Sequence, residues 1–166
     1  MVKIKCLIIA LAVAISGAVV LISVLQSDEY RIKRAFGSLA KWASKEEGEN
    51  NLTMVQKTRS IGSLCEKTCH IKAPGTIFSG TYSSQQISAL AARARMSFTG
   101  FKVRFDDLHI ELIQKEWARV RVTAQLMGMQ KRGEQVDDTR ELECRLHKAE
   151  GKWLFTHFEL IEVLER

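Results

Sequence analysis

The spacing of apolar residues changes along the chain at about residue 100. Between Asp28 and Gly100, apolar side chains recur every three or four positions, which is typical of helices that bury one face. From Gly100 onward, apolar and polar side chains alternate, which is typical of strands with one buried face. The pattern therefore predicts helices in the first part and strands in the second.

Three helices are predicted in the first part. Each begins at a residue whose side chain can accept a hydrogen bond from the first turn. These capping residues are Ser27 or Asp28 for the first helix, Asn51 for the second and Ser83 for the third. Ser83 is followed by Gln86 at the spacing of a capping box. Residues 69–73, which precede the turn Pro74-Gly75, predict a short strand between the second and third helices.

The alternating part predicts long strands joined by short turns at residues 114–116, near Gly133 and at residues 150–152. Such strands form an antiparallel, strongly curved sheet. Three helices that precede this sheet indicate an α+β domain, with the helices packed on one sheet face.

The last predicted strand, residues 153–164, is apolar on both faces near its middle. Strict alternation gives two sets of side chains: Trp153, Phe155, His157, Glu159 and Ile161 on one face, and Leu154, Thr156, Phe158 and Leu160 on the other. The second set has only one polar group, so we expect it to pack against the helices. The first set would then line a concave wall, with Trp153, Phe155, His157 and Glu159 as ligand-binding residues for an apolar molecule.

An uncharged stretch of twenty residues, 6–25, precedes the domain. As a helix it is about 30 Å long, which matches the hydrocarbon core of a bilayer. We expect an uncleaved membrane anchor at residues 1–27; a cleavable signal peptide is the alternative. The short basic N-terminus favours a cytoplasmic start, and a long folded domain can translocate regardless of its charge. The expected location is the inner (cytoplasmic) membrane, single-pass, with residues 28–166 extracytoplasmic.

Composition narrows the class of protein. The chain has 166 residues, of which 46% are hydrophobic and 27% charged, with one proline and a formal net charge of +6. This is the profile of a folded protein with one domain and a short appendage. Basic residues at strand spacing, interspersed with acidic ones and without interleaved aromatic residues, indicate solvated faces and no nucleic-acid binding; they are Arg93, Arg95, Lys102, Arg104, Arg119 and Arg121.

The order of the predicted elements resembles the nuclear transport factor 2-like (cystatin-like) α+β cone over about residues 28–164. The resemblance rests on Ala73-Pro74-Gly75 after the short strand, Ser79-Gly80 before the third helix, and the closing run 151–155. It implies a curved sheet around a cone-shaped pocket. The superfamily includes isomerases, polyketide cyclases and dehydratases as well as non-catalytic binding and assembly modules, so fold alone does not assign chemistry. The layout with one anchor also resembles assembly components of type IV secretion systems.

Candidate catalytic and metal-binding residues are few. Ketosteroid isomerases of this superfamily use an Asp directly before a Pro as general base, and the matching residue here is Ala73, which cannot transfer a proton. The run Cys65-x-x-x-Cys69-His70 lacks the second pair of ligands typical of zinc sites and differs from the C-x-x-C redox motif. Two semi-buried thiols or one structural disulfide are its alternatives. We expect no catalytic residue, no metal and no cofactor.

The leading hypothesis is a membrane-anchored, non-catalytic binding or assembly module. Its cone pocket or open sheet face would bind an apolar small molecule or a membrane protein partner, and the anchor would contact lipid. Ala10, Ala14 and Ala18 form a small-residue stripe that suits a homodimer as a further alternative. The rival hypothesis is a small-molecule cyclase, dehydratase or isomerase-like enzyme, with His157 and Glu159 as an acid–base pair in the pocket.

Overall fold

The computed structural model describes residues 27–161. The described residues belong to two units, 27–34 and 35–161. The predicted anchor at residues 6–25 lies outside the described residues. Among residues 27–161, no helix is both long and apolar enough to cross a membrane.

The described residues form helices and strands in the order α2, α3, β1, β2, α4, β3, β4, β5, β6. The helices are α2 (Asp28–Ala43), α3 (Asn51–Ser63) and α4 (Ser84–Met96). The strands are β1 (Cys65–Lys72), β2 (Gly80–Ser83), β3 (Phe98–Gln114), β4 (Trp117–Gln130), β5 (Gln135–Ala149) and β6 (Lys152–Ile161). The predicted helices and hairpin turns are confirmed; the short strand β2 was not predicted.

The helix starts follow from their capping residues. At α2 the Ser27 hydroxyl accepts a hydrogen bond from the Tyr30 amide at 3.3 Å. The predicted capping box of α4 is present, with Ser83 and Gln86 each accepting from the other's backbone amide. The prediction for α3 was one residue off: its cap is Asn50, whose side chain accepts from the Thr53 amide at 2.8 Å, because Asn51 already lies in the first turn.

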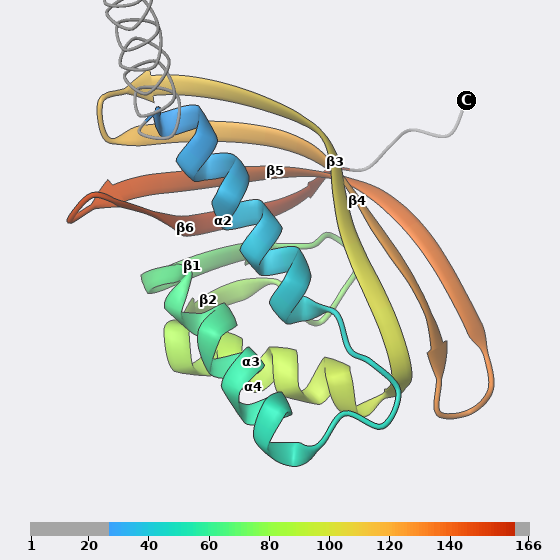
Figure 1. Cartoon of the computed structure of the whole chain (residues 1–166). Coiled ribbons are helices and arrows are strands. Elements are labelled where there is room, and N and C mark those ends of the chain that lie inside the picture. The colour runs from blue at the N-terminus through green and yellow to red at the C-terminus, as the bar shows by residue number, and fades with distance from the viewer. Residues whose placement is uncertain (1–26, 162–166) are drawn as a thin grey trace, which may run out of the picture. The chain divides into compact units, whose positions relative to one another are not determined.

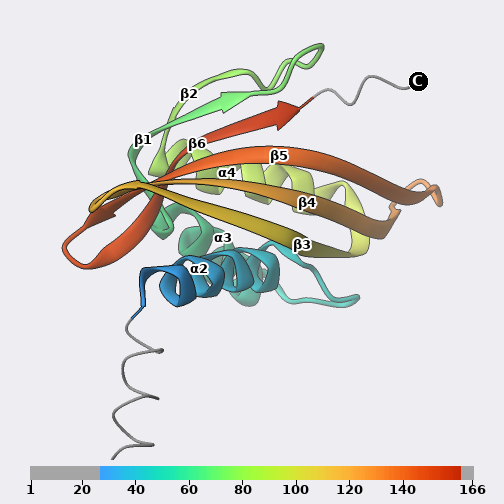
Figure 2. The ribbon, with the colours of Figure 1, turned by 90° about the horizontal axis from the view of Figure 1, so that it is seen from above.

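The six strands form one sheet in the order β2-β1-β6-β5-β4-β3, visible in Figure 1. The sheet curves over the helices, which leave its other face open (Figure 2). The prediction of a wholly antiparallel sheet is wrong at one place, where β1 pairs with β6 in parallel. The chain reaches β6 only after α4 and three long strands, and this long connection allows the parallel pairing.

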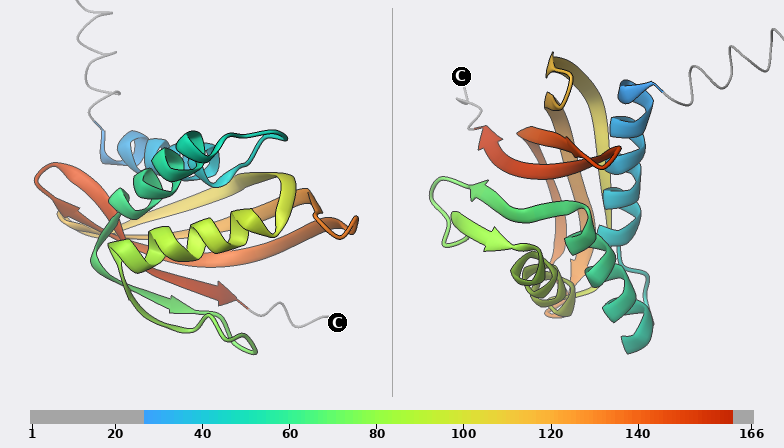
Figure 3. Two further views of the ribbon diagram at one scale, coloured as in Figure 1. Left: turned by 90° about the horizontal axis from the view of Figure 1, so that it is seen from below. Right: turned by 90° about the vertical axis from the view of Figure 1, so that its left-hand side faces the viewer.

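The core lies between the helices and the inner sheet face, on the side that Figure 3 shows covered by α3 and α4. Phe36 of α2 packs edge-on against Phe105 and Phe155, with ring centroids 5.4 and 5.0 Å apart. The inward positions of the central strands are buried as the alternation predicted; they include Ala118, Val120, Val122, Cys144 and Leu146. Burial of these apolar side chains is the main stabilising term of the domain.

Candidate functional site

A β-bulge at Thr156 separates the four residues predicted to bind a ligand. Phe155 lies opposite Leu146 of β5, but His157 lies opposite Arg145, so Thr156 has no cross-strand partner. One extra residue in a strand reverses the face of every residue after it. The predicted common face is therefore wrong: Trp153 and Phe155 point into the core, whereas His157 and Glu159 lie on the open face.

The same bulge corrects the predicted helix-packing set. Phe158 does face the core, where its ring stacks on Phe155 at 5.0 Å between centroids. Leu154, however, lies opposite His147 on the open face. The inner wall at this point carries aromatic side chains packed against Phe36, and Phe155 itself is 0% exposed. This part of the cone is filled by the protein's own side chains.

Polar side chains form two adjacent rows across the open face. Residues that lie opposite each other in a ladder share a face, so the strand registers identify the members of each row. The first row crosses all six strands and consists of Thr81, His70, His157, Arg145, Arg119 and Glu111. The second row consists of Lys72, Glu159, Glu143, Arg121 and His109. Together these residues are called the polar rows below.

Ion pairs connect the two rows at their centre. Arg119 lies 3.4 Å from Glu111 and 3.5 Å from Glu143, and Arg145 lies 3.7 Å from the same Glu143 carboxylate. All these side chains are partly solvated, so each pair contributes little to stability. These charged groups can therefore also interact with charged groups of another molecule that binds this face.

The β1–β6 end of the rows holds a hydrogen-bonded carboxylate. Lys72 donates to Glu159 at 2.5 Å, and His157 Nε2 lies 3.4 Å from the other carboxylate oxygen. The hydrogen bond from Lys72 holds the pKa of Glu159 below its ordinary value. The His70 ring, 6.4 Å from that of His157, accepts or donates a hydrogen bond with Thr81.

All four histidines of the sequence lie on this open face. His70, His157 and His109 belong to the polar rows, and His147 stacks on Trp117 with centroids 4.4 Å apart. His147 also lies 3.1 Å from Glu66 of β1. The side chains of His70 and His109 are both exposed.

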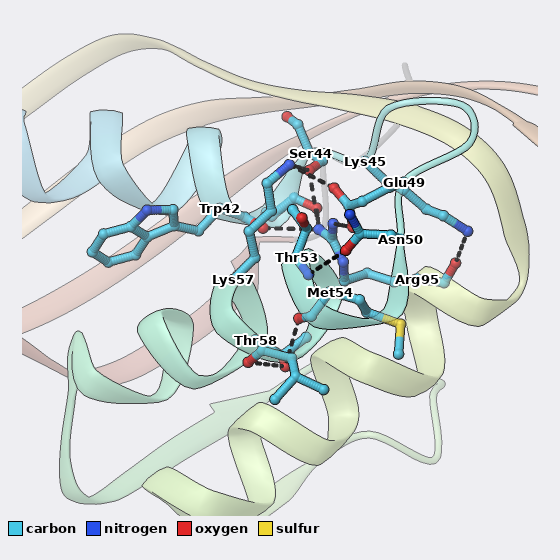
Figure 4. Close-up of polar contacts among 12 residues, drawn as sticks. Trp42, Ser44, Lys45, Glu49, Asn50, Thr53, Met54, Lys57, Thr58 and Arg95 are labelled. Carbon is cyan, nitrogen blue, oxygen red and sulfur yellow. Dashed lines mark hydrogen bonds and ion pairs between the residues drawn. The ribbon is translucent and has the colours of Figure 1, made fainter.

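A second polar cluster is buried between α2, α3 and α4 (Figure 4). Arg95, which is 1% exposed, reaches the end of α2 and donates from Nη1 to the carbonyls of Trp42, Ala43 and Ser44 at 2.8, 2.5 and 3.0 Å. Its Nη2 forms an ion pair with the buried Glu49. The prediction that Arg95 lies on a solvated face is wrong. Its guanidinium, at the end of α4, is enclosed by the end of α2 and by Glu49, just before α3.

The C-terminal ends of α2 and α4 each donate hydrogen bonds to the other. Lys45, just after α2, donates to the carbonyls of Arg95 and Phe98 at the end of α4, at 2.9 and 2.6 Å. Burial opposes the charged form of Glu49, but hydrogen bonds from Lys57 and Arg95 outweigh it and hold the pKa of Glu49 below its ordinary value. These contacts satisfy carbonyls that a helix end leaves unpaired. Their role is to hold the α2–α3 connection in place.

A hollow of about 1,090 Å³ lies beside this connection. The edge of β3 forms one wall, where Phe101 exchanges two backbone hydrogen bonds with Lys45 at 2.8 and 2.9 Å. Val103 then donates to the Ser44 hydroxyl at 2.9 Å. The hollow is open, its walls combine apolar side chains with lysines and glutamates, and it contains none of the four residues predicted to bind a ligand.

The burial of Arg95 and the bulge at Thr156 were not predicted, although the sequence contains a signal for each. Arg95 follows Ile87 by eight residues and Ala91 by four, which places it on the apolar stripe of α4. The last strand is apolar at Trp153 and Phe155 and again at Phe158, a phase change of one residue. A break in the alternation is the expected mark of a bulge.

Comparisons with known proteins identify the fold. No protein-family model matches the sequence, and a search of curated proteins found no match either. Among solved structures, an NTF2-like protein with a cystatin-like fold from Novosphingobium aromaticivorans is similar over 92% of this chain and 90% of its own, with a TM-score of 0.64 and 12% identity.

Two further solved structures illustrate how varied such proteins are. The association domain of CaMKII from C. elegans is similar over 81% of this chain and 95% of its own, with a TM-score of 0.59 and 12% identity. A proposed scytalone dehydratase from Novosphingobium aromaticivorans is similar over 86% of each chain, with a TM-score of 0.62 and 15% identity. At such identities the likeness concerns the fold, which is the α+β cystatin-like fold expected from the order of the elements.

Proposed function

We propose that this chain is a membrane-anchored, non-catalytic binding module that contacts a partner protein through the polar rows on the open face of its sheet. The observation that carries the proposal is the continuity of these rows. They cross the sheet from β2 to β3, and the helices of the described residues lie on the opposite face. A surface of mixed charge suits a specific protein partner, because complementary charges fix both partner and register.

The filled cone favours the open face over an apolar ligand site. Phe36, Phe155 and Phe158 occupy the inner wall where the predicted ligand would bind. Of the predicted binding residues, His157 and Glu159 keep a binding role in this proposal, since both belong to the polar rows. Trp153 and Phe155 have a packing role, because both are buried in the core.

The same geometry weakens the enzymatic alternative. An acid–base pair in a cystatin-like cone must face the enclosed side, where water is excluded. His157 and Glu159 face the open side, and Lys72 holds the Glu159 carboxylate in an ion pair. An assembly role is in keeping with the fold, since one similar structure is an association domain.

The membrane part of the proposal rests on residues 6–25, which lie outside the described residues. Their length and apolar character suit a single-pass anchor in the cytoplasmic membrane. The domain would then be extracytoplasmic. Resistance of the full chain to alkaline carbonate extraction, and digestion of residues 28–166 by protease added to spheroplasts, are the expected results. A soluble mature form that begins near residue 19–27 would contradict the anchor.

Site-specific photo-crosslinking tests the binding surface. A photo-reactive benzoylphenylalanine replaces Arg121, an exposed member of the second row, and in a matched chain it replaces Arg59, an exposed arginine on α3. After irradiation of intact cells, we expect a covalent protein adduct from position 121 and none from position 59. The mass of the adduct distinguishes a second copy of this chain from a different protein.

Two results would overturn the proposal. One is the absence of any adduct from position 121; the other is an equal yield from both positions. A charge reversal supplies the independent check: Arg121→Glu should lower the yield from a probe at position 109, whereas Arg132→Glu, in the β4–β5 turn, should leave it unchanged.

A further inference from the structure

Three thiols of the described residues lie together beneath the parallel pair of strands. Cys65, Cys69 and Cys144 are all free and buried. Cys65 lies opposite Phe155 of β6, and Cys144 lies opposite Phe158 of the same strand. Cys69 is 0% exposed and is close enough to both other thiols to interact with them electrostatically.

The irregular register of β1 brings two of these thiols, Cys65 and Cys69, close together. Between Cys65 and His70, β1 advances five residues while β6 advances only two, from Phe155 to His157. In a regular strand, residues four apart are about 13 Å from each other. Phe155 and His157, two residues apart in β6, are about 7 Å from each other. The stretch of β1 that pairs with them spans the same short distance, so Cys69 lies much closer to Cys65 than in a regular strand.

Cys65, the first member of this pair, borders a hollow. Cys65 lines an open hollow of about 810 Å³ between α3, α4 and the β5–β6 turn. Its sulfur is oriented by a 3.8 Å contact with the carbonyl of Ile61, and the residue is 6% exposed. The charged residues that line the hollow are Arg59, Lys67, Lys152, Glu66 and Glu150, so basic groups outnumber acidic ones.

The three thiols also differ in acidity. The hydrogen bond from Cys69 holds the pKa of Cys65 below its ordinary value, in spite of burial. The same contact, with burial, raises the pKa of Cys69, and burial raises that of Cys144. Thiolate is the nucleophilic form of cysteine. Because Cys65 lines the hollow and is 6% exposed, while Cys69 and Cys144 are both 0% exposed, Cys65 is the thiol that reacts first.

We propose that Cys65 and Cys69 form a dithiol–disulfide couple, in which Cys65 attacks a small disulfide that enters the hollow and Cys69 resolves the product. The pair is independent of the polar rows, which lie on the other face of the sheet. The basic groups around the hollow suit a disulfide with carboxylate groups, such as oxidised glutathione.

The reaction takes place in two exchange steps. The Cys65 thiolate attacks one sulfur of the disulfide RSSR, which forms a Cys65–SR mixed disulfide and releases RS⁻. The Cys69 sulfur then attacks Cys65, which forms the Cys65–Cys69 bond and releases the second RS⁻, while the two cysteine protons pass to the released thiolates. In sum, two protein thiols and RSSR give one protein disulfide and two RSH. The disulfide reagent is the oxidant, and the protein dithiol is oxidised.

Oxidised glutathione and mass spectrometry test the proposal on the full chain. After incubation, peptide mapping should find that the segment containing Cys65 and Cys69 has lost two hydrogen atoms, while Cys144 keeps its free thiol. Cys69→Ser should instead retain one glutathionyl group on Cys65. In the reduced wild-type chain, we expect iodoacetamide to modify Cys65 at least about tenfold faster than Cys144.

The matched control is Cys144→Ser, a buried thiol of the same core outside the pair, which should form the Cys65–Cys69 bond as the wild type does. The proposal is overturned if the mapped peptide of the folded wild type keeps both thiols. It is also overturned if Cys65 and Cys144 are alkylated at the same rate. Both results come from the unsubstituted chain, so they do not depend on how well any variant folds.

Discussion

Replacement of Arg95 by methionine removes the centre of the buried cluster and should destabilise the domain by about 3–5 kcal/mol. Three carbonyls at the end of α2 lose the hydrogen bond from Arg95, each bond being worth about 1 kcal/mol, and only that of Ser44 keeps a second donor, Lys57. Glu49, only 4% exposed, keeps Lys57 as a partner at 2.6 Å but loses the guanidinium. These losses of free energy are not additive, because relaxation of the α2–α3 connection would let water reach several of the unpaired groups at once.

A double-mutant cycle separates the ion pair from the rest of the cluster. Glu49→Gln leaves the bonds of Arg95 to the carbonyls, so it should cost less than Arg95→Met. The double variant should lose less free energy of unfolding than the two single variants together. With both residues replaced, neither the Arg95 charge nor the Glu49 charge is left buried without its partner. The free energy of unfolding is measured by guanidinium titration of the full chain, followed by the fluorescence of Trp42, Trp117 and Trp153.

The dependence on pH supplies a second test of the same cluster. The folded pKa of Glu49 is lowered, so its contribution is present above the unfolded pKa and is lost as pH falls through the lower, folded value. Stability should therefore fall on acidification, and less steeply in Glu49→Gln. A cost below about 1 kcal/mol for Arg95→Met, or strict additivity in the cycle, would refute the reasoning.

Two other predictions concern packing. Gly62→Ala should destabilise the domain, because a Cβ at this position would lie 2.5 Å from the Ser84 carbonyl oxygen. Gly37→Ala should instead stabilise α2 by about 0.5–1 kcal/mol, since no atom lies within 4 Å of a Cβ built there. Thermal unfolding measures both effects, and equal effects would contradict the close α3–α4 crossing. Phe155→Ala should cost about 3–5 kcal/mol and His157→Ala about 1 or less, and the reverse order in guanidinium titrations would place the bulge elsewhere.

The sequence predicted what local rules determine. The capping box at Ser83 and the hairpin turns were correct, because turn and cap chemistry acts over a few residues. The parallel pairing of β1 with β6 was not predictable, since it joins segments that are distant in the sequence. The bulge at Thr156 was missed because strict alternation was assumed through a strand whose pattern changes phase.

The candidate site depended on that single assumption. With Thr156 left out of the alternation, Phe155 and Phe158 fall on one face and His157 on the other, as the structure has them. Arg95 was missed for a different reason. A charged residue on an apolar helix stripe is buried only where partners exist, and Glu49 and the end of α2 come from other parts of the chain.

Covalent labelling of histidine tests the role of the open face most directly, because all four histidines of the sequence lie there. Diethyl pyrocarbonate labels accessible imidazoles, and peptide mapping reports each position separately. In native membranes, we expect His70, His109 and His157 to be labelled several-fold less than in the purified chain, because the partner covers the polar rows. Lysines outside the rows, such as Lys67 on the hollow, label equally in both with an amine reagent and serve as the control. Equal labelling of the three histidines in both preparations would contradict binding through this face.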